Sequence, residues 1–186
     1  MSARFNLSRA AILTLVLLPL LLAGCGPSGL GGATIGNDPC LLQTYQSRSN
    51  GNLGGTQSAY STLAGQLDAL QGPNYTIAPS QDISETLNTI ALFQIKLDQQ
   101  QAYLKNSTPP APSQARPFLD HVGAAVPDLK TGAYLLAQAY IDAHAGHTVA
   151  AKDIADAARV YIRQGRNLLA QAASDLANLH TDSVNC

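Results

Sequence analysis

The amino-acid sequence predicts an all-α protein, an up-down-up-down four-helix bundle that follows a signal peptide and a flexible glycine-rich tether. Apolar residues recur at spacings of three, four and seven along four long stretches, which is the periodicity of helices that bury one face. Clusters of proline, glycine and asparagine separate these stretches, and none of them alternates like a strand. Four long helices joined by short loops favour antiparallel neighbours, hence the bundle.

The first 24 residues have the composition of a secretory signal. Arg4 and Arg9 give the start of the chain a positive charge, and no acidic residue accompanies them. The apolar run at 10–23 has 14 residues, which is shorter than the ~20 that a membrane-spanning helix needs. Small residues precede Cys25, as a signal-peptide cleavage site requires. We therefore expect residues 1–24 to be removed on export.

Four residues at this junction, Leu22, Ala23, Gly24 and Cys25, resemble the lipobox of bacterial lipoproteins. The resemblance implies a thioether-linked diacylglyceryl group on Cys25, cleavage before it and acylation of the new amino terminus. Two or three acyl chains, at ~0.8 kcal/mol per buried methylene, would hold the protein at a membrane. The alternative is an ordinary signal peptide or an uncleaved anchor, with Cys25 incidental.

The envelope position follows from the same resemblance. Gly26, and not aspartate, follows Cys25. By similarity to Gram-negative lipoproteins, this implies sorting to the outer membrane, facing the periplasm. In a Gram-positive envelope the protein would lie on the outer face of the cytoplasmic membrane.

Residues 25–37 form the lipidated tether, and residues 38–186 form one helical domain. Glycine dominates the tether, so it behaves as a flexible coil that places the domain on the order of 20 Å from the lipid. Besides Cys25 the chain has two cysteines, Cys40 and Cys186. An even pair in an oxidising compartment predicts a disulfide, and a four-helix up-down topology would bring both ends together. Two free thiols near mobile ends are the alternative.

Composition excludes several functions. After cleavage the chain has nine basic and twelve acidic residues, a net charge of −3, which gives no indication of nucleic-acid binding. Glu85 is the one glutamate, so the carboxylates of a di-iron bundle are lacking, and Met1 is the one methionine. No haem-attachment, nucleophile-elbow, phosphate-loop or dinucleotide motif occurs. We predict no cofactor besides the lipid on Cys25.

The first two helices are predicted from their caps. Asp38 and the proline after it start a helix in which we expect an interruption or a kink at Ser49–Gly55, before a second piece from about Thr56 to Leu70. A loop follows at Asn74–Ser80. Asp82 and Glu85 form a capping-box pattern that starts the second helix, which ends within 106–110. The faces expected to be buried are Tyr60, Leu63, Leu67 and Leu70, and then Ile83, Thr86, Ile90, Phe93, Leu97, Gln100 and Leu104.

The last two helices are predicted at about 118–145 and 148–180. Pro127 should kink or restart the third helix, and Gly146 should cap it. Three glycines inside these helices, Gly123, Gly132 and Gly165, permit close helix contact, with a ligand-sized gap as the alternative. The faces expected to be buried are Leu119, Val122, Val126, Leu129, Ala133, Leu136 and Tyr140, and then Ile154, Ala158, Tyr161, Leu168, Ala172, Leu176 and Leu179.

The nearest approach to a metal site is Asp142, His144 and His147, with His121 or His180 as added ligands. A helix end lies between His144 and His147, so their side chains do not share one helix face. A positive charge near a helix C-terminus is favoured by the helix dipole, which explains His144 and His180 without a metal. We predict no metal.

The sequence therefore predicts a non-enzymatic envelope lipoprotein whose bundle is a structural or interaction module. Its partners would be the membrane, through the lipid, and other envelope proteins or the cell wall. The alternative function is a binding lipoprotein that holds a small apolar ligand or a metal between its helices.

Overall fold

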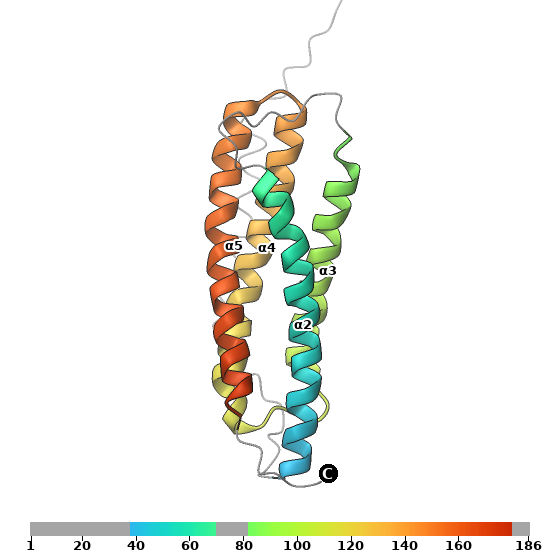
Figure 1. The fold of residues 1–186 in the computed structure, drawn as a ribbon, viewed down its shortest axis with the longest axis vertical. Helices are drawn as coiled ribbons and strands as arrows, with labels where there is room; N and C mark the ends of the chain where they lie inside the picture. The colour runs from blue at the N-terminus through green and yellow to red at the C-terminus, as the bar shows by residue number, and fades with distance from the viewer. Residues whose placement is uncertain (1–37, 70–81, 180–186) are drawn as a thin grey trace, which may run out of the picture. The chain divides into compact units, whose positions relative to one another are not determined.

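A computed structural model describes residues 38–69 and 82–179 of the chain, and these form a helical bundle (Figure 1). Its long helices are α2 (Pro39–Ala69), α3 (Ser84–Asn106), α4 (Arg116–His144) and α5 (Thr148–Ala177), and a short 3-10 helix, η2 (Ser113–Ala115), precedes α4. No strand occurs in these two ranges, which confirms the all-α class.

Several predicted features lie outside the described residues. These are the signal peptide, the lipid site Cys25, the tether, the loop at 74–80, His180 and Cys186. Within the part of the chain that is described, none of the helices combines the length and the apolar character needed to cross a bilayer.

The helices contact one another in a closed order. α4 and α5 pack most closely, α3 contacts both α2 and α4, and α2 meets α5 through sparser contacts. Polar bonds tie the helix ends: the Ser49 and Tyr103 hydroxyls are 3.0 Å apart, and the Tyr140 hydroxyl donates to the Gln66 carbonyl at 2.8 Å. These bonds join α2 to α3 and α2 to α4.

α2 is one continuous helix, so the interruption at Ser49–Gly55, one of the two expected outcomes, does not occur. Ser49, Leu53 and Thr56 follow helical spacing and are all buried. The three glycines of the segment lie on the open side, where an added Cβ would meet nothing within 4 Å. Burial of the inner face therefore overrides the low helix propensity of the outer one.

The predicted helix starts are close to those observed. Asp38 caps α2 because its carboxylate accepts the Cys40 backbone N–H at 2.9 Å. At α3 the Asp82 carboxylate accepts the Ser84 N–H at 2.8 Å, and the helix begins at that serine. These bonds satisfy N–H groups that a helix start leaves without partners.

Gly146 ends α4 as predicted. Its φ is +84°, in the left-handed region that favours glycine. The Gly146 N–H donates to the Ala143 carbonyl at 3.0 Å, and the His147 N–H donates to the Asp142 carbonyl at 2.9 Å. This is the Schellman pattern, which turns the chain directly into α5.

α4 continues through Pro127. A kink or a restart was expected there, and the helix does not restart. Pro127 cannot donate to the Gly123 carbonyl four residues earlier. Both residues are exposed, so solvent reaches that carbonyl. All residues predicted for the inner face of α4 are buried, as are Ile90, Phe93, Leu97, Gln100 and Leu104 of α3. Ile83 and Thr86, the first two residues predicted for the α3 face, are only partly buried.

The predicted face of α5 is wrong at Tyr161. The Tyr161 side chain is 38% exposed, whereas its neighbour Ile162 is 1% exposed and takes the core position. The reason is a steric match with α4, since a Cβ on Gly132 would lie 2.5 Å from Ile162 Cγ1. Ile162 fills the hollow that this glycine leaves.

Two of the three helix glycines allow the close approach that was predicted. A Cβ on Gly165 would lie 2.5 Å from Leu129 Cγ and 3.1 Å from the Ala125 carbonyl oxygen. Gly132 fits against Ile162 in the same way, so side chains fill both sites and neither is a ligand-sized gap. Gly123 has open space around it, and the prediction is wrong there.

Replacing Gly165 by alanine is expected to lower the free energy of unfolding. The clash with Leu129 and the α4 backbone represents overpacking, which costs about 1–3 kcal/mol. The control is Gly123→Ala, where free space leaves the helix propensity of alanine to stabilise by about 1 kcal/mol. Urea unfolding followed by circular dichroism measures both, and equal shifts of the same sign would contradict the close contact.

Candidate functional site

The predicted metal candidates do not assemble into a site. His147 Nδ1 lies 3.4 Å from an Asp142 carboxylate oxygen, whereas the buried His144 Nδ1 has no hydrogen-bond partner. No group of three or more metal-ligating side chains gathers anywhere in the two described ranges. His144 lies near Asp82, whose carboxyl pKa is lowered first by hydrogen bonds from Ser84 and then by the charge of His144.

An imidazole–carboxylate pair joins the start of α4 to the end of α5. His121 Nδ1 is 2.6 Å from Asp175 Oδ2, and both side chains are partly buried. A groove of about 340 Å³ lies beside it and exposes Asp175, with Gln114 and Pro117 on its wall. The pair joins residues 54 positions apart in the sequence, so it helps to fix α4 against α5.

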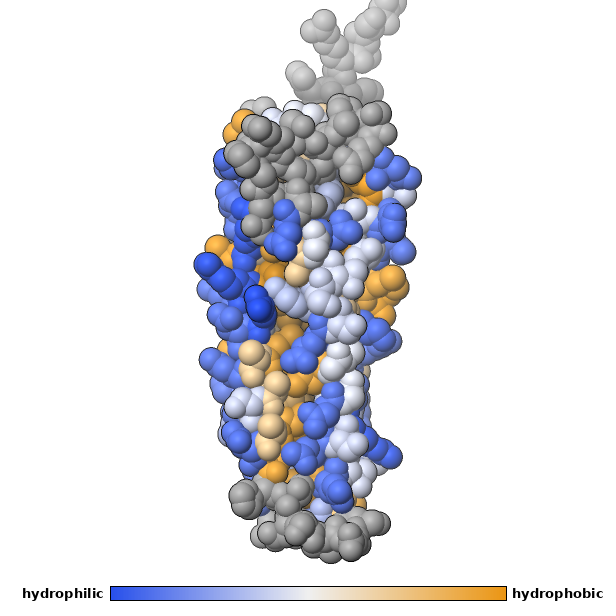
Figure 2. All heavy atoms as spheres, viewed as in Figure 1, coloured by the Kyte–Doolittle hydropathy of each residue, from blue (hydrophilic) through white to orange (hydrophobic). Residues whose placement is uncertain are grey.

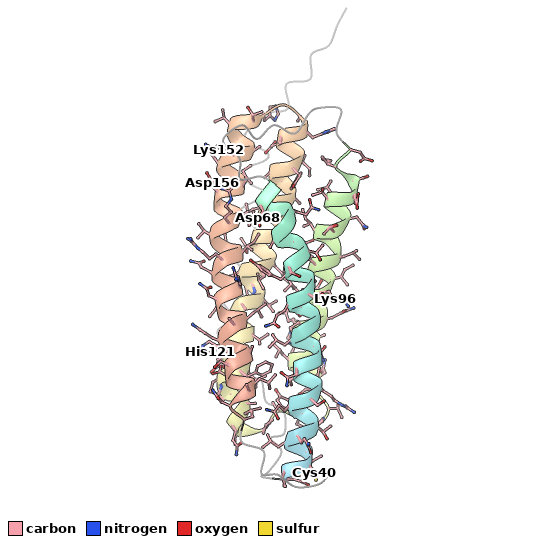
Figure 3. The ribbon with its side chains drawn as sticks, in the orientation of Figure 1. Cys40, Asp68, Lys96, His121, Lys152 and Asp156 are labelled. Carbon is pink, nitrogen blue, oxygen red and sulfur yellow. The ribbon has the colours of Figure 1, made fainter. Side chains whose placement is uncertain are left out.

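Sequence reasoning did not find this pair. From the sequence, His121 was only an added ligand for the metal candidates, and its neighbour Asp120 binds Arg116 at 2.9 Å. The partner is 54 residues away, and only the register of α4 on α5 brings it near. The sequence signal that could have indicated the pair is a polar residue beside the apolar face of each helix, His121 in α4 and Asp175 in α5. Figure 3 labels His121 at this end of the bundle.

Buried polar groups form a seam between α2 and α3. The Thr56 hydroxyl donates to Gln100 Oε1 at 3.2 Å, and Gln100 Nε2 has no partner among the described residues. Further along, Ser49 meets Tyr103, and burial raises the pKa of Tyr45 to about 12. Serine, threonine, glutamine and tyrosine side chains are all uncharged at physiological pH, so these contacts between α2 and α3 are between neutral groups.

An apolar groove of about 440 Å³ lies on the outer side of the same two helices. Leu92 and Ile95 of α3 form its rim and are 54% and 50% exposed. Phe93 lies at its base, and Lys96 stands beside it (Figure 3). The outer side of α3 shows apolar side chains in Figure 2. Leu92 and Ile95 together form a small apolar patch beside the groove.

A second groove, of about 500 Å³, separates α2 from α5. Apolar side chains are visible between these helices in Figure 2, with polar surface on either side. Tyr60 and Leu67 come from α2, and Ile162 and Val160 come from α5. Charged residues border it, and Figure 3 labels two of them, Asp68 on α2 and Asp156 on α5.

Of the predicted covalent sites, Cys40 alone falls within the described residues. It lies in the first turn of α2 and is not a free thiol. Cys25 and Cys186 lie outside the described ranges, so lipidation and the pairing of Cys40 with Cys186 stay predictions.

Comparison with known proteins identifies no relative: no family model, no curated protein and no solved structure matches this chain.

Proposed function

We propose that this chain is a membrane-anchored cell-envelope lipoprotein whose helical bundle is a non-enzymatic interaction module. The charged start, the short apolar run and the lipobox-like residues before Cys25 support the anchor. The lipid would place the domain at the outer membrane facing the periplasm in a Gram-negative cell, and on the outer face of the cytoplasmic membrane otherwise.

The proposal includes an up-down-up-down order of the four helices. Contacts between residues at opposite ends of neighbouring helices support it. Ser49 near the start of α2 meets Tyr103 near the end of α3, and His121 near the start of α4 meets Asp175 near the end of α5. An even number of alternating helices returns the chain to the end where α2 begins, which favours a disulfide between Cys40 and Cys186.

The observation that carries the interaction role is the apolar groove between α2 and α3. Leu92 and Ile95 stand at its rim, and burial of the exposed half of each side chain would favour association by roughly 1.5–3 kcal/mol in total. Lys96 adds a positive charge at the edge. A groove of this kind fits an amphipathic helix that inserts apolar residues at i and i+4 and places an acidic residue near Lys96.

A crosslinking experiment tests this function. A photoreactive residue at position 92 is expected to give a product with another envelope protein in intact cells, mapped to an amphipathic helix that carries an acid. Ile95→Gln should reduce the yield by about tenfold or less, in line with the loss of about 1 kcal/mol of apolar contact. Val149→Gln, an exposed apolar residue outside the groove, is the matched control.

Three outcomes would overturn the proposal. One is a loss of yield with Val149→Gln equal to that with Ile95→Gln, and another is a product that maps to a second copy of this chain. The third is a yield that Ile95→Gln leaves unchanged.

The alternative function, a small apolar ligand or a metal held between helices, draws its support from the groove between α2 and α5. Tyr45, Phe93, Phe118 and the inner leucines fill the space within the bundle in the described part of the chain, so a ligand would bind at a groove near the surface.

A further inference from the structure

The groove between α2 and α5 combines an apolar floor with a basic border. Leu67 and Ile162 form the floor and are nearly buried, and Ala64 continues it along α2. Its volume of about 500 Å³ lies within the range of small-molecule sites, roughly 300–1,000 Å³. The groove exists because α2 contacts α5 sparsely, while the glycine contacts draw α5 toward α4.

Three arginines of α5 line this groove. Arg159, Arg163 and Arg166 follow spacings of four and three, so they share one face of the helix. Arg159 binds the Asp156 carboxylate. Arg163 and Arg166 make no hydrogen bond or ion pair in the described part of the chain, although both lie at the groove.

Positive charges outnumber negative charges at this groove. Like charges three or four residues apart on a helix are mildly destabilising, so an anion bound between the arginines would relieve their repulsion. Two acids also border the groove, Asp68 and Asp156, so three positive charges face two negative ones. The net charge of +1 matches a monoanion better than a dianionic phosphate.

We infer that this groove binds a long-chain carboxylate. Its carboxylate would accept hydrogen bonds from the guanidinium groups of Arg163 and Arg166, whose planar donors suit a carboxylate. Its alkyl chain would lie along Ala64, Leu67 and Ile162, where it leaves water. The site uses helices α2 and α5, and it is separate from the groove between α2 and α3 to which the interaction role is assigned.

Photolabelling of the full-length protein in nanodiscs of zwitterionic lipid tests the inference. The probe is hexadecanoate with a terminal diazirine, and the comparison probe is the alcohol with the same chain. Labelled peptides are expected from α2 between Tyr60 and Asp68 and from α5 between Asp156 and Arg166. The Arg163→Gln/Arg166→Gln variant should lose about tenfold in labelling, and the alcohol should label weakly.

The matched control is Lys105→Gln/Lys152→Gln, which removes the same charge from exposed positions outside the groove. This control should label like the unmodified protein. The arginine variant should also unfold at a slightly higher temperature without ligand, because repulsion along α5 is relieved. If the double variant does not fold, each single substitution is measured, and a several-fold loss is expected from each.

Equal labelling by the acid and the alcohol would overturn the inference. So would labelling that survives loss of both arginines, or labelled peptides confined to other helices. Loss of the crosslinks at position 92 would leave this result unaffected, since that experiment reports on the groove between α2 and α3.

Discussion

Replacing Cys25 by serine is expected to abolish incorporation of labelled palmitate into the protein. The hydroxyl of serine cannot form the thioether that carries the diacylglyceryl group. Cleavage before residue 25 and acylation of the new amino terminus are implied by the same lipobox resemblance, which requires the cysteine, so all acyl chains should be lost together. Intact-mass measurement of the processed chain should show the same change as a loss of the acyl mass.

Cys40→Ser is the control for this experiment. It removes a thiol from the first turn of α2 and should leave palmitate labelling unchanged. Label retained in Cys25→Ser, or a mature chain that begins elsewhere than residue 25, would show that the resemblance to a lipobox does not extend to the chemistry. The proposal that the protein is held at a membrane would then fall.

Replacing Phe118 by alanine is expected to lower the free energy of unfolding by about 3–5 kcal/mol. The Phe118 side chain is fully buried, and its ring meets the Tyr45 ring edge to face, with centroids 6.5 Å apart and an interplanar angle of 87°. Its loss would leave a cavity where the start of α4 packs against the start of α2. Urea unfolding followed by circular dichroism gives the value.

Tyr134→Ala is the matched comparison, because it removes an aromatic ring from the same helix at a position that is 49% exposed. The expected change there is within about 0.5 kcal/mol. Similar losses at both positions would indicate that Phe118 is not part of a packed core.

Apolar periodicity was a reliable guide where each buried residue is large. Ile90, Phe93, Leu97 and Leu104 of α3 are all buried as predicted. In α5, where alanine and glycine supply much of the inner face, periodicity placed Tyr161 in the core. Ile162 takes the core position because it fits against Gly132. Gly132 belongs to α4, so the sequence of α5 alone does not reveal this fit.

The same limit applies to the candidate sites. The resemblance to a lipobox is local, so it can be read from four adjacent residues. The pair of His121 and Asp175 joins two helices, and the groove that Arg163 and Arg166 line lies between two others. Neither has a pattern in sequence, because each depends on how the helices are aligned.

The buried polar contacts between α2 and α3 determine how these helices align. Sliding one helix by a single turn, about 5.4 Å, would place Leu53 opposite Gln100 in place of Thr56 and would separate the hydroxyls of Ser49 and Tyr103. Each lost bond would leave a polar group without water or a partner, at a cost of about 1–3 kcal/mol. Leucines alone would tolerate such a slip, so the buried polar contacts fix the register of α2 along α3.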